Sequence, residues 1–145
     1  MAKGYPDFYG MQTFPKHGPV TDSTVDPLVV ASDGDVTIHN IAGKGVIKGG
    51  FLRCGGELDG WSTDFILTVD GSTITAITGL QLWGAEVFSA DCGAFYLVDY
   101  NDPLRVIGLA FSPGITFDSQ FLFQIHHREG ANRNIYSTLY YTRIL

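Results

Sequence analysis

The sequence predicts an all-β fold, a jelly-roll-like antiparallel β-sandwich, on three observations. First, 52 of the 145 residues are Val, Ile, Thr or aromatic, which strands favour, and only three are Glu, a common residue of helix surfaces. Second, 18 glycines separate the apolar stretches and supply turns. Third, eight or nine short apolar segments follow one another, several with period-two alternation, as two packed sheets require.

The chain length suits one domain, and the composition changes near residue 27. Residues 1–27 contain four of the six prolines, so we expect an extended, irregular N-terminal arm there and the sandwich in residues 28–145. Two interpretations of the arm stay open: it packs on its own domain, or it reaches a neighbouring subunit. The candidate subunit-interface residues of the arm are Tyr5, Pro6, Phe8, Tyr9, Phe14 and Pro15.

The expected sandwich begins at LVVAS, which leads through Asp33-Gly34 into VTIHNI and then into the glycine-interrupted segment GKGVIKGGFLRC. The strongest hairpin signal is DFILTVDGSTITAI, in which Asp70-Gly71 forms the turn. Further strands are expected in QLWGAEVFSAD, GAFYLVDYND, LRVIGLAFSPG, ITFDSQFLFQIHHR and NIYSTLYYTRIL.

The charge pattern disfavours nucleic acid and membranes as partners. The net charge is −6, and the nine Lys and Arg residues are scattered, so they form no basic stripe that would neutralise phosphates. No apolar run reaches the roughly 18 residues that a spanning helix needs, and no secretion signal is evident. We therefore expect Cys54 and Cys92 to be reduced and buried, with one disulfide across the sandwich as the alternative.

No segment predicts a catalytic or metal centre. His126 and His127 are adjacent in an expected strand, where neighbouring side chains point to opposite faces, so the two imidazoles would not share one ion. Asp-Gly pairs such as Asp70-Gly71 are typical of turns, and no calcium-loop motif surrounds them. Nucleophile-elbow, phosphate-loop and dinucleotide-binding motifs do not occur. We expect no cofactor and no enzymatic activity.

The aromatic residues outside the arm have two interpretations. Most are expected in the core or in subunit contacts, but the two tryptophans, together with several tyrosines, could instead form a platform that stacks against sugars. Trp61 and Trp83 are the candidate ligand-stacking residues. A carbohydrate-binding module would expose both of them on one concave face.

Three stretches of the chain resemble small virion proteins of tailed bacteriophages: GYPDFYGMQTFPKHGP, VTIHNIAGKGVIKGGFLRCGG and DFILTVDGSTI. The similarity covers roughly residues 4–80 and consists of a GYPD-aromatic segment ending in FP-x-x-G, a glycine-broken strand pair and a strand that ends in a VDG turn. It implies a jelly-roll structural module on the phage particle, assembled in the reducing host cytoplasm. It also implies contacts with other capsid or tail subunits and self-association about a three-fold axis, but no catalytic residues.

We therefore expect a structural virion protein, as a capsid decoration in preference to a tail-fibre component. The low fraction of charged residues, 17%, agrees with a subunit that buries much of its surface against copies of itself, most simply as a trimer. The alternative function is a carbohydrate-binding module or host-receptor adhesin. A metal-dependent, cupin-like enzyme ranks third, because the histidine and glutamate motif of cupins is absent.

Overall fold

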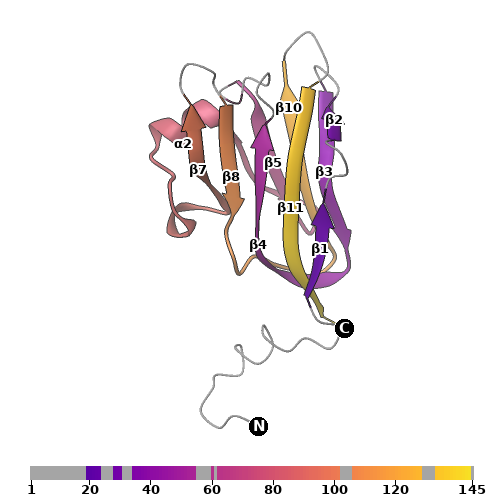
Figure 1. Cartoon of the computed structure of the whole chain (residues 1–145). Helices are drawn as coiled ribbons and strands as arrows, with labels where there is room; N and C mark the ends of the chain where they lie inside the picture. The colour runs from indigo at the N-terminus through magenta and orange to yellow at the C-terminus, as the bar shows by residue number, and fades with distance from the viewer. Residues whose placement is uncertain are drawn as a thin grey trace.

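The computed structural model describes residues 19–23, 28–30, 34–54, 60, 62–101, 106–128 and 133–144 (Figure 1). Strands dominate these ranges, and a short helix, α2 (Gly79–Gly84), and a 3-10 turn, η1 (Ala90–Cys92), lie between β6 and β7. The strands are β1 (Pro19–Ser23), β2 (Leu28–Val30), β3 (Gly34–Ala42), β4 (Lys44–Cys54), β5 (Asp64–Val69), β6 (Ser72–Thr78), β7 (Phe95–Asn101), β8 (Val106–Phe111), β9 (Thr116–Phe117), β10 (Gln120–His127) and β11 (Arg133–Ile144).

The strands form two antiparallel sheets that pack face to face (Figure 1). The seven-stranded sheet has the order β1-β11-β4-β8-β7, with β2 also paired to β11 and β9 to β4. The four-stranded sheet has the order β3-β10-β5-β6. The chain crosses from one sheet to the other after β2, β3, β4, β6, β9 and β10. Strands that are distant in sequence therefore become neighbours, as in a jelly roll. The prediction of an all-β sandwich is confirmed.

Alternation of buried and exposed positions places the core between the sheets. In β10 every second side chain is buried, and Phe121, Phe123 and Ile125 have no exposed surface. Phe111 of the seven-stranded sheet packs edge-to-face on Phe123, with ring centroids 4.9 Å apart. Aromatic pairs of this kind add to the burial of apolar area, so they hold the two sheets together.

The hairpin prediction at Asp70-Gly71 is confirmed. Both residues have positive φ, 51° and 81°, as a two-residue turn between twisted strands requires. The Asp70 carboxylate also accepts hydrogen bonds from the backbone N–H groups of Asp118, Ser119 and Gln120, at 2.7–3.0 Å. These donors, that of Asp118 first, hold the pKa of the Asp70 carboxyl well below its ordinary value. One side chain therefore joins the β5–β6 turn to the start of β10.

Two sequence expectations are wrong about where regular structure begins. The sandwich does not start near residue 28, because Pro19–Ser23, inside the expected arm, pairs with β11 as strand β1. The segment QLWGAEVFSAD is not a strand: its first residues belong to α2, which begins with a capping box between Thr78 and Gln81. In that box the Thr78 hydroxyl accepts from the Gln81 N–H at 3.1 Å, and the Gln81 side chain accepts from the Thr78 N–H at 2.9 Å.

The expected strand ITFDSQFLFQIHHR is divided. Residues Thr116–Phe117 pair with β4 in the seven-stranded sheet, whereas Gln120–His127 belong to the four-stranded sheet. The chain crosses between the sheets at Asp118 and Ser119, whose N–H groups donate to Asp70. The division therefore occurs at the point where the Asp70 carboxylate replaces the ladder hydrogen bonds.

Candidate functional site

The two adjacent histidines point to opposite sides of the four-stranded sheet, as their positions on one strand predict. His127 is buried, whereas Nδ1 of His126 donates to Oδ1 of Asp35 at 2.9 Å on the outer face. No three His, Cys, Asp or Glu side chains gather within metal-binding reach among the residues that the structure describes. Within the same ranges, no helix is long and apolar enough to cross a membrane.

A buried histidine and serine meet between the sheets, but their geometry does not suit nucleophilic catalysis. Nε2 of His39 lies 2.7 Å from Oγ of Ser137, and the Ser137 hydroxyl donates to the carbonyl of Phe51 at 2.8 Å. A hydroxyl carries one proton, so both contacts are satisfied when His39 donates and Ser137 accepts. The serine is only 3% exposed, which leaves a substrate no access to Oγ.

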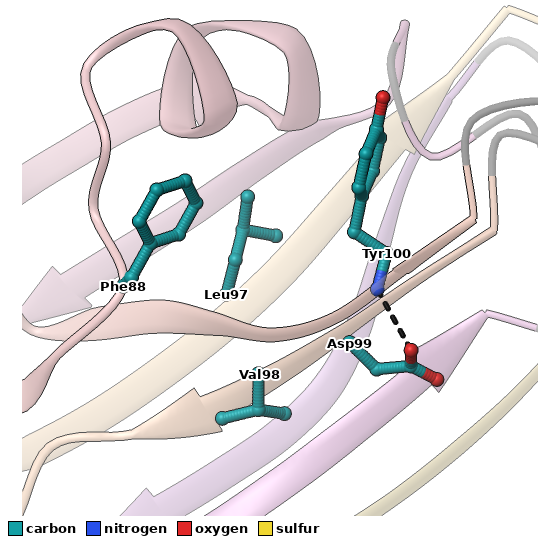
Figure 2. Close-up of a pocket in the computed structure, with 5 residues that line it drawn as sticks. All are labelled: Phe88, Leu97, Val98, Asp99 and Tyr100. Carbon is teal, nitrogen blue, oxygen red and sulfur yellow. Dashed lines mark hydrogen bonds between the residues drawn. The ribbon is translucent and has the colours of Figure 1, made fainter.

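A hollow of about 420 Å³ lies along β7, next to the segment that follows α2 (Figure 2). We call it the β7 hollow. It is lined by Phe88, Leu97, Val98, Asp99 and Tyr100. Figure 2 shows Phe88 and Tyr100 on either side of Leu97, with Val98 and Asp99 along the strand. Its size lies in the range of small-ligand sites, 300 to 1,000 Å³ by order of magnitude.

The strand β7 is irregular where it borders the hollow. Its pairing with β8 shifts register between Leu97 and Asp99, which is a β-bulge that places the exposed side chains of Val98 and Asp99 next to each other. Oδ1 of Asp99 accepts a hydrogen bond from the N–H of Tyr100 at 2.8 Å. The bulge therefore fixes one carboxylate oxygen beside the exposed side chain of Val98, on the side of β7 opposite to Leu97 and Tyr100 (Figure 2).

The candidate ligand-stacking residue Trp83 lies on α2, and its ring stacks on Tyr100 with centroids 5.8 Å apart and an angle of 30° between the planes. The Trp83 side chain is 41% exposed, but it does not line the hollow itself. Its contact is with Tyr100, which does line it. Trp61 lies outside the described residues, so its expected place beside Trp83 stays a prediction. The hollow is also lined by Phe88 and Asp99, and no local pattern in the sequence marked these two residues as part of one site.

A second candidate surface is the outer face of the seven-stranded sheet. Phe51 of β4 and Tyr136 and Tyr140 of β11 project from it, and we call these three side chains the aromatic band. Their exposed fractions are 46%, 48% and 46%. Phe51 pairs with Thr138, so it lies diagonally between the two tyrosines of the neighbouring strand, within reach of both. The band is a contiguous apolar patch and not three scattered side chains.

The outer face of the four-stranded sheet has a different character. Its side chains hydrogen-bond to one another across strands: Nε2 of Gln120 donates to Oδ1 of Asn40 at 2.9 Å, and His126 donates to Asp35. These polar groups are satisfied within the face. Covering the aromatic band would therefore remove more apolar surface from water than covering the outer face of the four-stranded sheet.

The six candidate residues of the arm, Tyr5, Pro6, Phe8, Tyr9, Phe14 and Pro15, lie outside the described residues, and their role stays a prediction. Cys92 carries a free thiol, but the expectation that it is buried is wrong: it is exposed at the end of η1, where Sγ lies 3.4 Å from Oγ of Ser89. The Cys54 side chain is also outside the described part of the chain.

The exposed aromatic groups thus gather in two places, the β7 hollow and the aromatic band, and neither holds a group arranged for bond making or breaking. No protein-family model matches the chain, and no curated protein matches it significantly.

Proposed function

We propose that this chain is a structural protein of a tailed-bacteriophage particle, which binds other virion subunits as a capsid decoration in preference to a tail-fibre component. The observation that carries the proposal is the aromatic band on the outer face of the seven-stranded sheet. Three large aromatic side chains on one sheet face favour burial in a protein interface, where aromatic residues are enriched. The jelly-roll fold and the resemblance of residues 4–80 to small virion proteins support the same function.

The direction of β1 favours an arm that reaches a neighbouring subunit. Pro19 pairs with Thr142 and Ser23 with Thr138, so the chain runs toward the level of the aromatic band as it passes from Pro19 to Ser23. Residues before Pro19 would have to reverse direction to cover the band of their own subunit, but not to contact another subunit. The arm is long enough for this, because 18 residues span up to about 60 Å when extended.

The proposal is tested first by the assembly state. Light scattering after gel filtration should give a multiple of 15.8 kDa, with a trimer as the expected species. Replacing Phe51 and Tyr140 together with Ser should shift the protein toward monomer while the far-ultraviolet dichroism spectrum stays that of a β protein, since both side chains are already exposed. A wild-type protein that is monomeric at tens of micromolar, and that fails to bind particles, would contradict the proposal.

The second test locates the protein. Immunogold electron microscopy of phage particles from the organism that carries the gene should label capsids, and label on the tail would shift the role to a tail component. A truncation of residues 1–16, which leaves β1 intact, should remain folded and lose its attachment to the particle. Particles without label, when the protein is present in the lysate, would overturn the proposal.

A further inference from the structure

A second hollow, of about 240 Å³, lies between β6 and the segment that leads from α2 to β7. We call it the β6 hollow. Its lining is largely apolar and includes Ile74 and Ile77 of β6, Leu82 of α2, Val87, Cys92 of η1 and Phe95 of β7. Leu82 and Phe95 are core residues, so the hollow extends from the surface to the core. It is smaller than most small-molecule sites, which measure roughly 300–1,000 Å³, and its size suits one inserted side chain.

The strand pairing places the β6 side of this hollow on the inner face of the four-stranded sheet. Thr75 pairs with Leu67, and Ile77 pairs with Phe65. Paired residues of an antiparallel ladder project from the same face, and Leu67 and Phe65 have no exposed surface. Thr75 and Ile77 therefore face the opposite sheet, but they are only half-buried. The space beside them is open because β6 is the last strand of its sheet.

β6 is also the sheet edge that its sequence protects least against pairing. The strand reads STITAIT, without a charged residue or proline, and its one irregularity is a bulge at Ile74, whose side chain is 58% exposed. By contrast, β1 begins with a proline, β3 carries Asp35, and at the β7 edge the Leu97 N–H donates to the carbonyl of Val87 at 2.9 Å. Prolines and charges are usual means by which edges avoid added strands. Because β6 has neither, its edge can accept a strand from another chain.

We propose that the β6 hollow receives the N-terminal arm of a neighbouring subunit. The arm lies along β6 as an added strand, and the side chain of Phe8 or Phe14 enters the hollow. In strand addition, main-chain hydrogen bonds supply affinity and a pocket for a side chain supplies specificity. The proposal rests on one part of the function proposed above, the arm that contacts another subunit, and it names the surface that receives this arm.

Residues 7–14 of the arm suit this role by their sequence. They form a run of eight residues without proline, between Pro6 and Pro15, which is long enough to pair with the seven residues of β6. Phe8 and Phe14 are six positions apart, so both side chains project from the same face of an extended strand. Either ring would leave water for a largely apolar lining.

Charge favours the same contact. Residues 1–18 contain two lysines and one aspartate, whereas residues 72–101, which include β6, α2, η1 and β7, contain three acidic residues and neither Lys nor Arg. The three acidic residues, Glu86, Asp91 and Asp99, are exposed. A weakly basic arm is therefore attracted to the side of the molecule that holds the hollow.

The arm and the hollow lie at opposite edges of the sandwich. The arm precedes β1, at one edge of the seven-stranded sheet, whereas the hollow adjoins β7, at the other edge (Figure 1). To reach the hollow of its own subunit, the arm would have to cross the sandwich, about 19 Å over four strand spacings. A donor at one edge and an acceptor at the other make a head-to-tail contact, which closes into a ring such as a trimer.

The test is chemical crosslinking of the full chain through Cys92, which lines the hollow and has an exposed thiol. Gly10→Cys and Gln12→Cys, made one at a time, place a second thiol on the face of the arm that carries both phenylalanines. With a short bis-maleimide and tens of micromolar protein, we expect covalent dimers and trimers for at least one of them, which disappear when Cys92→Ser is added. Replacing Phe8 and Phe14 together with Ala should reduce the crosslinked fraction at least tenfold.

Two lysine substitutions form a matched pair. Ile74 and Val98 are both 58% exposed, but Ile74 lines the β6 hollow and Val98 does not. Ile74→Lys should reduce the crosslinked fraction at least tenfold, whereas Val98→Lys should leave it unchanged, and thermal melts verify that each variant is folded. The proposal is overturned if Cys92 is crosslinked only within its own chain, if neither arm cysteine reaches Cys92, or if the two lysine variants behave alike.

The crosslinks and the location of the protein on the particle fail independently. If particles carry the label but no arm cysteine reaches Cys92, the chain is a virion protein whose arm binds another surface, and the acceptor proposed for the arm is wrong. If the Cys92 crosslinks form but particles carry no label, the virion function is wrong and the contact between arm and hollow stands.

Discussion

Inside the core, Nε2 of His39 donates to Oγ of Ser137 over 2.7 Å and so links the four-stranded sheet to the seven-stranded sheet. Ser137 in turn donates to the carbonyl of Phe51, the residue at the centre of the aromatic band. His39 and Ser137 are 1% and 3% exposed, so water does not replace a lost partner. The backbone beneath the band is thereby connected to the opposite sheet by two consecutive hydrogen bonds.

Removing the serine hydroxyl should therefore destabilise the fold. Ser137→Ala removes the acceptor of the buried His39 Nε2 and a donor to the Phe51 carbonyl, and we expect it to lower the free energy of unfolding by about 1–3 kcal/mol. Urea denaturation measures this value. Thr73→Ala, at an exposed position of β6, is the control and should change it by less than about 0.5 kcal/mol. Equal effects of the two changes would show that the link contributes nothing.

The hydrogen bonds to Asp70 should make the stability of the fold depend on pH in the acid range. Because the pKa of the Asp70 carboxyl is depressed in the folded protein, its contribution is complete above the unfolded value of about 3.9 and is lost as the pH falls below it. Asp70→Asn, which also tolerates positive φ, should have a lower melting temperature than wild type at pH 7, and the difference should shrink below about pH 4.

Melting curves between pH 7 and pH 2 provide the measurement. Asp118→Asn is the control, because it removes a carboxylate from the β9–β10 connection that contacts Asp70 but keeps the backbone N–H that donates to Asp70. It should follow the wild-type acid profile. A difference between wild type and Asp70→Asn that is constant with pH would refute the assignment.

Gly50 should not accept a side chain. It lies in β4 with φ of 150°, and a Cβ atom there would collide with the backbone carbonyl of Thr138 in β11. We expect Gly50→Ala to destabilise the protein by about 2–4 kcal/mol, because a backbone atom cannot move aside as a flexible side chain does. Gly34→Ala is the comparison, since a Cβ atom added at Gly34 would meet no atom within 4 Å, and it should be close to neutral. Unfolding in guanidinium measures both.

The capping box at the start of α2 should contribute to the stability of the fold. Thr78→Ala removes the hydroxyl that accepts from the Gln81 N–H, and we expect it to lower the free energy of unfolding by about 1 kcal/mol. Thr78→Ser keeps the hydroxyl and should behave as wild type in urea denaturation. A loss of stability that is equal in Thr78→Ser would point to a cause other than the cap.

The features that the sequence predicted correctly depend on local chemistry. Asp70-Gly71 predicts its own turn because both residues accept positive φ, and the opposite orientations of His126 and His127 follow from strand geometry alone. β1 could not be foreseen, because its partner in β11 lies more than 110 residues away and Pro19 suggested irregular chain. Proline is compatible with a strand at its first position, where it stands here.

The β7 hollow illustrates a different limit. Trp83 was identified by its residue type, but the residues that line the hollow come together only through the β7 bulge and the segment after α2. The helix itself had a signal, Thr78 followed three residues later by Gln81, which the apolar composition of the segment concealed. Residue type thus predicted one aromatic group near the site, and tertiary packing determined which groups form it.

The pairing of β1 with β11 determines when the seven-stranded sheet can be completed. Residues 19–23 leave the ribosome early, but their partners are residues 138–142, so the edge of the seven-stranded sheet stays open while the intervening chain is synthesised. Contacts of such long sequence separation form slowly, since a large loop has to close before any of them is gained. Strand β1 can therefore join the seven-stranded sheet only after residues 138–142 have been synthesised, so this edge closes after the strands between them have been made.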